Sequence, residues 1–241
     1  GRILPAELET DAQLWLEEYG GFSKGDSLRV FDMDRHRPGD RLFPYAAGTF
    51  GSGANMAFTR EALERIGGFD PALGAGSKGV GGDDLAAFFR VITSGYALVY
   101  QPAAVVHHWH RRDYQGLRKM AHGYGVGLTA YLTSILLQEP RRVPEILAAL
   151  PAAAAHVLNP SSPKNHRKSA NFPRQLTWDE RMGMLRGPWA YLSSRREVRR
   201  RDRTLRDSGS ERSGVHAWKR SRVETGESER TRVAADLQGE A

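Results

Sequence analysis

The sequence contains no cysteine among its 241 residues, which excludes disulfides and metal sites built on thiolates. It also lacks an apolar run of about 18 residues, the length expected of a membrane-spanning helix. The opening segment Gly1–Pro5 has no apolar stretch of the kind found in signal peptides, so we expect a cytoplasmic protein. Hydrophobic residues make up 40% of the chain, a little low for a chain that is globular throughout. These shortages favour one sizeable folded domain with polar extensions.

Positive charge is concentrated towards the C-terminus. The formal net charge is +7, but residues 160–206 contain 13 Lys or Arg against 4 Asp or Glu. The rest of the chain is therefore close to neutral, and the sequence predicts a basic extension. After Arg206 the chain is rich in Ser, Gly, Glu and Arg, which predicts a disordered tail. A basic extension binds anionic lipid, binds nucleic acid or stays solvated, and the charge alone leaves these readings open.

Apolar periodicity and glycine positions indicate an α/β arrangement before residue 110. Thr59 is expected to cap a short helix, and the glycine-rich residues 67–82 predict a mobile loop. These few strands cannot form a complete doubly wound sheet, so we expect part of a larger α/β domain. The pattern predicts strands over 54–58, 97–100 and 103–107, and helices over 6–20, 83–94, 113–137, 143–158 and 178–203.

Two adjacent carboxylates, Asp83 and Asp84, follow the glycine-rich loop and open a predicted helix. The helix dipole favours a carboxylate in the first turn, where it stays ionised near neutral pH. An ionised Asp can take the proton of a sugar hydroxyl as that hydroxyl attacks an anomeric carbon. The alternative is structural, because Asp is also a common helix N-cap.

A group of imidazole and guanidinium side chains follows about 25 residues after the carboxylates. His108 and His110 share one face of an extended segment, where they could ligate a metal or contact a diphosphate. Arg111 and Arg112 would add positive charge there. An isolated His-x-His pair is more often found in a surface or capping role, so the neighbouring motifs decide between the two readings.

In their order along the chain these motifs resemble the C-terminal half of a family 2 glycosyltransferase with the GT-A fold. The resemblance covers roughly residues 1–137. It implies a partial, Rossmann-like GT-A domain over residues 1–122, a helical, partly apolar and basic extension over 123–205, and a tail over 206–241. The runs that carry it are Gly51–Phe58, Arg60–Leu63, Gly67–Asp70, Gly82–Arg90 and His107–Arg112.

The resemblance implies an inverting transferase that moves a sugar from a nucleotide-activated donor to a hydroxyl of a saccharide or lipid-linked acceptor. The second acid of the family motif is the catalytic base, and that role falls on Asp84. His108 and His110 match late histidines that bind a divalent cation, Mg²⁺ or Mn²⁺, or touch the diphosphate. The implied donor- and acceptor-binding positions are Asp83, Gly53, Asn55, Arg111 and Arg112.

The chain departs from the family pattern in three places. Asp83 stands where the family usually has Glu, Ala86 replaces a further acid, and His107 replaces a common Trp. Asp32-Met33-Asp34 is not assigned as the metal-binding Asp-x-Asp, because it lies only about 50 residues before Asp84 and follows no nucleotide-binding βαβ unit. We therefore expect the nucleotide-binding half to be absent and this chain alone to have little or no turnover.

Two other classes of function stay open. The Arg-rich residues 195–206 suggest a basic module that binds nucleic acid or an anionic membrane, but no aromatic platform or nucleic-acid motif accompanies them. Nucleic acid is therefore not an expected partner. Residues 126–137 and 143–158 are short and apolar, which fits burial or a peripheral position on the inner face of the membrane. A metal hydrolase using Asp83, Asp84, His108 and His110 lacks a clear ligand set.

Overall fold

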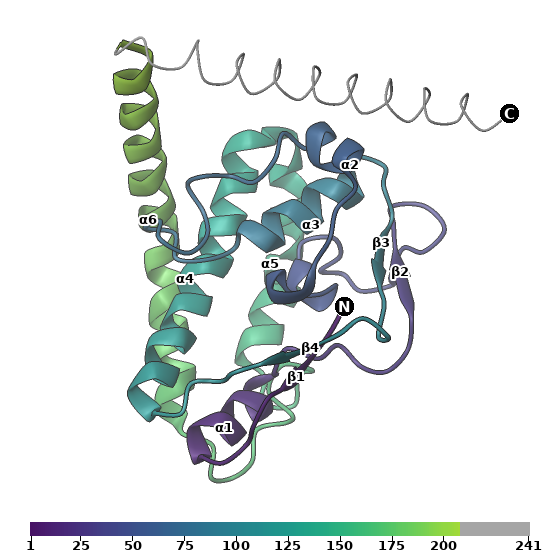
Figure 1. The fold of residues 1–241 in the computed structure, drawn as a ribbon, viewed down its shortest axis with the longest axis vertical. Coiled ribbons are helices and arrows are strands. Elements are labelled where there is room, and N and C mark those ends of the chain that lie inside the picture. Colours follow the sequence, from purple (N-terminus) through teal and green to yellow (C-terminus); the bar gives the residue numbers. More distant parts are fainter. Residues whose placement is uncertain (208–241) are drawn as a thin grey trace, which may run out of the picture. The chain divides into compact units, whose positions relative to one another are not determined.

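The computed structural model describes residues 1–207, so the disorder predicted for the tail lies outside the described part. The described chain is mixed α/β and mainly helical (Figure 1). Residues Gly1–Arg195 form one compact unit, and the chain from Arg196 onwards belongs to a second. The boundary predicted at residue 122 falls inside helix α4 (Tyr114–Gln138). No helix among residues 1–207 is both long and apolar enough to cross a bilayer.

Both sheets of the described residues have two strands. Strand β1 (Arg2–Pro5) pairs in parallel with β4 (Val105–His108), and β2 (Arg29–Phe31) pairs antiparallel with β3 (Leu98–Tyr100). The register places Leu4 opposite His107. The two strands expected near residues 97–107 are confirmed, and β1 and β2 are additions to the prediction. The N-terminal strand thereby holds the histidine-bearing strand in place (Figure 1).

Helix α1 (Asp11–Tyr19) begins later than the predicted residue 6. The reason is local: Thr10 and Gln13 form a capping box, in which the Thr10 hydroxyl accepts from the Gln13 N–H and the Gln13 side chain accepts from the Thr10 N–H. The chain before Thr10 is not helical, because Arg2–Pro5 forms β1 and residues 6–9 connect that strand to the helix. The inner face of α1 packs with α4, with Phe172 and with the start of α6 (Arg174–Asp207) in a cluster of Ala12, Leu16, Leu117, Ala121, Phe172 and Leu176.

The strand predicted over 54–58 is wrong. Gly53–Asn55 forms a short 3₁₀ turn, η2, which Ser52 caps. The Asn55 amide donates to the carbonyl oxygens of Arg2 and Ala104, so the segment is tied to the β1–β4 region through a side chain. The cap predicted at Thr59 is confirmed, since its hydroxyl accepts from the Ala62 N–H at the start of α2 (Arg60–Arg65).

The longer predicted helices are confirmed with small shifts at their ends. Helix α3 (Asp83–Thr93) buries six side chains along its apolar face, and Asp113 caps α4 by accepting from the Gly116 N–H. Helix α5 (Val143–Leu158) matches its predicted bounds, whereas α6 (Arg174–Asp207) is longer than predicted at both ends. Gly123, Gly125 and Gly127 lie inside α4 and do not interrupt it.

Gly125 of α4 and Gly183 of α6 allow close packing between the two helices. A methyl group at Gly125 would overlap the carbonyl oxygen of Glu180, and one at Gly183 would overlap that of His122. The Thr129 hydroxyl donates to the Met184 carbonyl across the same interface at 2.7 Å. The two helix backbones therefore touch directly, as small residues at four-residue spacing allow.

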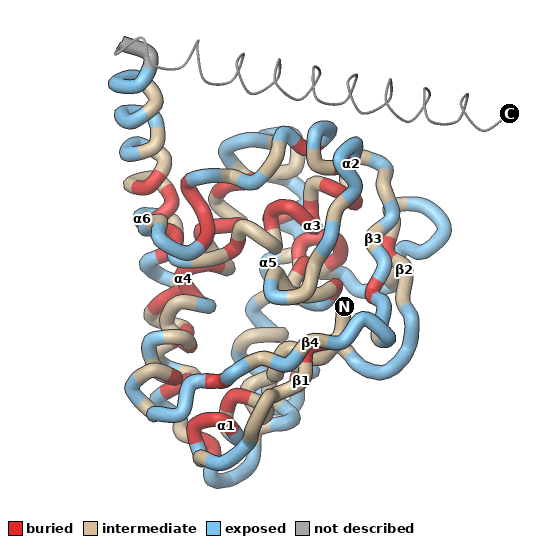
Figure 2. Tube along the Cα trace, in the orientation of Figure 1, coloured by how far each residue is buried: buried red, intermediate tan, exposed pale blue. Residues whose placement is uncertain are grey.

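The basic region is consequently not a solvated extension throughout. Residues 174–195 belong to the first compact unit, and Arg118 of α4 bonds Asp179 of α6 at 2.7 Å. Figure 2 shows buried and exposed positions alternating along this part of α6, the pattern of a helix with one packed face.

The close approach predicts a large difference between two glycine-to-alanine substitutions in the middle of α4. Gly125→Ala places its methyl group on backbone atoms and should destabilise the fold by about 3 kcal/mol. Gly123→Ala is the matched control, because its methyl group would meet only the Val80 Cγ1 atom, at 3.2 Å, and gains helix propensity. Chemical denaturation of both variants measures the difference, and equal stability would contradict the described packing.

Candidate functional site

A cavity of about 650 Å³ lies where α1, α3, α4 and α6 meet the glycine-rich segments. Asp83, Asp84 and Gly53 of the predicted site line it. Its other polar or aromatic walls come from positions scattered along the chain, namely Tyr19, Phe22, Lys24, Ser52, Lys119, Tyr124, Lys164 and Glu180. The cavity size is typical of small-molecule sites, which span roughly 300–1,000 Å³.

The Asp84 carboxylate is fixed by backbone donors. One oxygen accepts from the Gly53 N–H at 2.8 Å, and the other accepts from the Leu85 N–H at 2.8 Å. Burial raises the pKa of Asp84 above its ordinary value, while these N–H donors act in the opposite direction. A methyl group at Gly53 would lie 3.0 Å from the Asp84 Cβ, so a side chain there would crowd the pairing.

Two further glycine contacts place the acidic pair. Gly82, the N-cap of α3, has φ +85°, and a methyl group on it would lie 2.5 Å from the Gly127 carbonyl of α4. A methyl group on Gly74 would lie 2.9 Å from the carboxyl carbon of Asp83. The start of α3 is therefore pressed between α4 and the loop, and Asp83 and Asp84 point to different neighbours.

His108 and His110 form a linked pair. Their Nδ1 atoms are 3.0 Å apart, and the His110 Nε2 lies 2.9 Å from a carboxylate oxygen of Glu17. The Phe22 ring, which lines the cavity, contacts both imidazole rings, with ring centroids 4.6 Å from His108 and 5.7 Å from His110. The imidazoles thus lie beside the cavity with Phe22 between.

The Glu17 carboxylate determines which nitrogens carry protons. A carboxylate only accepts, so His110 donates from Nε2 and its Nδ1 accepts when the ring is neutral. His108 must then donate from Nδ1, which leaves its Nε2 with a lone pair. Burial lowers the pKa of His108, and His110 and Arg111 act in the same direction, which favours this neutral ring.

Other predicted residues lie against protein groups. Arg112 bonds Glu7 and Glu9. Arg111 is exposed, and the Asn55 amide is bound to two backbone carbonyls. None of these three residues lines the cavity. The cations on the cavity wall are lysines instead.

No pattern in the sequence indicated the lysines or the polar end of the cavity. Lys164 pairs with Glu180 at 2.5 Å, and Glu180 is only 3% exposed. The second Glu180 carboxylate oxygen and the Tyr19 hydroxyl are buried and make no hydrogen bond of normal geometry among residues 1–207. They lie near each other, because burial and the neighbouring Glu180 carboxylate together raise the pKa of Tyr19. Tyr19 stacks on Tyr124 with centroids 6.0 Å apart. Only the α4–α6 packing brings these side chains together, which no local pattern could reveal.

Lys24 is a partly buried cation of the cavity wall. It lines the cavity, and burial lowers the pKa of its ammonium group, with Arg167 and Arg29 acting in the same direction. The carboxylates of Asp84 and Glu17 act in the opposite direction and raise this pKa. Lys24 therefore interacts electrostatically with the carboxylate in the cavity and with the one that bonds His110.

A divalent cation finds no complete ligand set here. Residues 1–207 contain no group of three His, Cys, Asp or Glu side chains placed to hold a metal ion. Both ring nitrogens of His110 are engaged, which leaves His108 as the available imidazole of the pair. Asp32 of the unassigned Asp-x-Asp instead accepts from His36, whose bonds lower the pKa of Asp32 to about 2.

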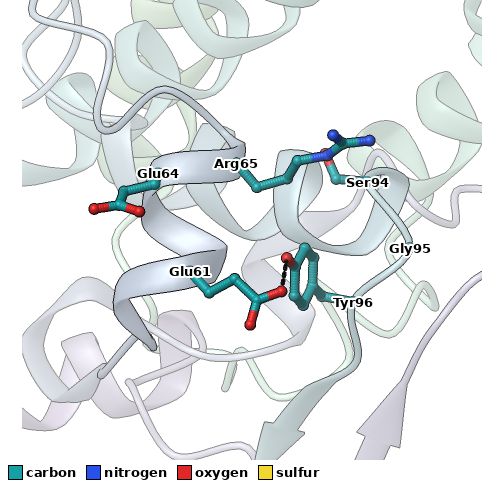
Figure 3. A pocket seen from close by; sticks show the side chains of 6 residues that line it. All are labelled: Glu61, Glu64, Arg65, Ser94, Gly95 and Tyr96. Atoms are coloured by element: carbon teal, nitrogen blue, oxygen red, sulfur yellow. Dashed lines mark hydrogen bonds between the residues drawn. The ribbon is translucent and has the colours of Figure 1, made fainter.

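A second hollow, of about 670 Å³, lies between α2 and the turn that follows α3 (Figure 3). It is open to solvent and is lined by Glu61, Glu64, Arg65, Ser94, Gly95 and Tyr96. The Tyr96 hydroxyl donates to Glu61 at 2.8 Å across it. None of the predicted site residues lies there, so the cavity around Asp84 is the candidate site.

Comparisons of the chain with family models, with curated proteins and with solved structures find no match. The family reading therefore depends on the ordered motifs, two of which, Gly51–Phe58 and Gly82–Arg90, contribute residues to the cavity wall.

The hydrogen-bond chain predicts the tautomers of both imidazoles. In long-range ¹H–¹⁵N spectra at pH 8, His110 should be protonated at Nε2 and His108 at Nδ1, because Glu17 accepts from His110. Glu17→Ala should remove this preference, and His107→Gln provides a control on the neighbouring residue. A His108 ring protonated at Nε2 in the parent protein would refute the chain.

Burial of Asp84 predicts that its charge opposes folding. Its raised pKa means that the folded state takes up a proton more readily than the unfolded state, so stability falls as pH rises from about 4 through the folded-state pKa. Asp84→Asn removes this titration but leaves one of the two N–H donors without an acceptor, so the predicted effect is one on pH dependence: the Tm of Asp84→Asn relative to the parent should be higher at pH 7 than at pH 4. Calorimetry at both pH values measures this, with Asp83→Asn as the matched control. A relative Tm that is unchanged or lower at pH 7 than at pH 4 would be the contrary result.

Proposed function

We propose that this chain is the acceptor-side part of an inverting family 2 glycosyltransferase with the GT-A fold, which uses a nucleotide-sugar donor. The observation that carries the proposal is the Asp84 carboxylate, which lines a cavity and is held by the N–H groups of Gly53 and Leu85. These residues belong to two of the motif runs that suggested the family. Their contact in space is what a shared site requires.

In this mechanism Asp84 is the catalytic base. Its carboxylate takes the proton of the acceptor hydroxyl while the hydroxyl oxygen bonds to the anomeric carbon of the donor sugar. The bond from that carbon to the nucleoside diphosphate breaks, and the configuration inverts. A carboxylate whose pKa is raised by burial is a stronger base than a solvated one, which suits this step.

The cavity wall suits a saccharide acceptor. A sugar ring presents C–H faces that pack on aromatic rings, and Tyr19 and Tyr124 offer such rings. It also presents hydroxyls that both donate and accept, and the neighbouring Tyr19 hydroxyl and Glu180 oxygen, which make no hydrogen bond of normal geometry, can pair with them. We assign these groups to holding the acceptor while Asp84 receives its proton.

The groups that would bind the departing diphosphate are a cation and an imidazole near Phe22. His108 and Lys24 are our candidates, because Arg112 is already bound to two glutamates. The Mg²⁺ or Mn²⁺ that the resemblance implies has no step in this proposal, since residues 1–207 supply no complete ligand set. The same finding leaves the metal hydrolase without support.

Activity measurements on the enzyme joined to a nucleotide-binding half test the proposal. Asp84→Asn should lower kcat by about 100-fold or more, because a general base contributes about 10²–10⁴-fold, while the Kd for the nucleotide sugar stays unchanged. The assay follows nucleoside diphosphate release from a panel of uridine, guanosine and thymidine diphospho-sugars with saccharide acceptors.

Asp26→Asn is the control for this measurement. It removes an exposed carboxylate that pairs with Arg2, and it should retain parent activity. Full transfer by Asp84→Asn would remove Asp84 from the role of base, and the proposed mechanism would fail with it.

A further inference from the structure

The packed portion of α6, residues 174–195, has a second face that the cavity does not use. Its inner face holds Glu180, Gly183 and Gly187 against α4 and the cavity. On the opposite face, apolar side chains recur at spacings of four and three residues, which places them in one line along the helix. We call this line the outer stripe; it consists of Trp178, Met182, Leu185, Trp189 and Leu192.

The outer stripe is strongly exposed. Trp178 is 55% exposed, Leu185 71% and Trp189 70%, and Met182 and Leu192 are partly exposed. Three large apolar side chains more than half exposed in one line make a continuous patch, which marks an interaction surface.

The charge around the outer stripe has one sign. Arg174 and Arg186 are exposed beside it. The two acidic residues in this portion point the other way: Asp179 bonds Arg118, and Glu180 is buried against Lys164. The outward face of residues 174–195 therefore offers apolar and cationic groups without a free carboxylate of its own.

We propose that the outer stripe docks α6 onto an anionic lipid bilayer, with the helix lying in the interface plane. Tryptophan and leucine side chains would enter the boundary between headgroups and acyl chains, and the arginines would pair with lipid phosphates. The helix cannot insert end-on, because its Gly183–Gly187 face is packed against α4.

The same charges argue against a second copy of the chain as the occupant. A two-fold interface places the same patch on both sides, so both copies would contribute arginines and neither a carboxylate. Residues 174–195 have no outward carboxylate to compensate them. An anionic surface fits this face better.

Docking would also orient the candidate site, a consequence that depends on the proposed function. Glu180 lines the cavity from the inner face of the helix whose outer face would contact lipid. The cavity would then be held one helix diameter, about 10 Å, from the bilayer surface. That height suits an acceptor saccharide linked to a lipid.

The test is co-sedimentation of the whole chain with vesicles of phosphatidylcholine alone or with 30% phosphatidylglycerol. The parent should bind the anionic vesicles, and Leu185→Ser/Trp189→Ser should bind about tenfold more weakly, since two exposed apolar side chains no longer enter the bilayer. Leu28→Ser/Trp109→Ser is the matched control, because these side chains are 56% and 71% exposed elsewhere, and it should bind as the parent does.

Arg174→Gln/Arg186→Gln should weaken binding to anionic vesicles and reduce its salt dependence. Parent-like binding by Leu185→Ser/Trp189→Ser would overturn the proposal, since attraction would then come from charge elsewhere in the chain. Absence of binding by the parent would overturn it too, as would a dimer in light scattering that the same double substitution dissolves. Calorimetry establishes that each variant is folded. The vesicle assay needs no turnover, so its failure leaves the proposed function standing.

Discussion

Direct contact between the backbones of α4 and α6 is the constraint on which the candidate site depends. Gly125 and Gly183 leave no room for a side chain between the helices, and the Thr129 hydroxyl bonds across the contact. The approach brings Tyr124 of α4 and Glu180 of α6 to one cavity. Separating the helices by the width of one methyl group would move two walls of that cavity apart. The close contact therefore needs glycine in the middle of these two helices, although glycine lowers their helix propensity.

A second backbone contact, between Gly82 and Gly127, joins the acidic pair to the same helix. It presses the start of α3 against α4, and the Gly53 N–H then meets the Asp84 carboxylate. The burial that raises the pKa of Asp84 follows from this packing. Burial destabilises the ionised carboxylate and, by raising its pKa, also makes it a stronger base. The lower stability and the higher basicity therefore have the same structural cause.

Local signals in the sequence predicted most of the helices and the acidic pair. The helices predicted to start at Thr59 and Asp113 do start there, with these residues as N-caps. Asp83 and Asp84 open a helix after the glycine-rich loop, as predicted. Strand β1 was missed because its partner, β4, lies about 100 residues away. Lys24 and Glu180 were missed for the same reason, since their place in the cavity depends on packing between segments far apart in sequence. Arg112 illustrates the opposite error: a cation next to a motif pairs with nearby glutamates.

The two-sided arrangement of α6 has a consequence for how related proteins can differ. Each residue of a helix turns the chain by about 100°, so a single inserted residue between Glu180 and Trp189 would rotate everything after it by more than a quarter of a circle. Tryptophan would swing inwards and glycine outwards. We therefore expect insertions and deletions in related proteins to fall in the connecting segments, such as residues 32–46 or 159–173. The number of residues between Glu180 and Trp189 in α6 should stay the same.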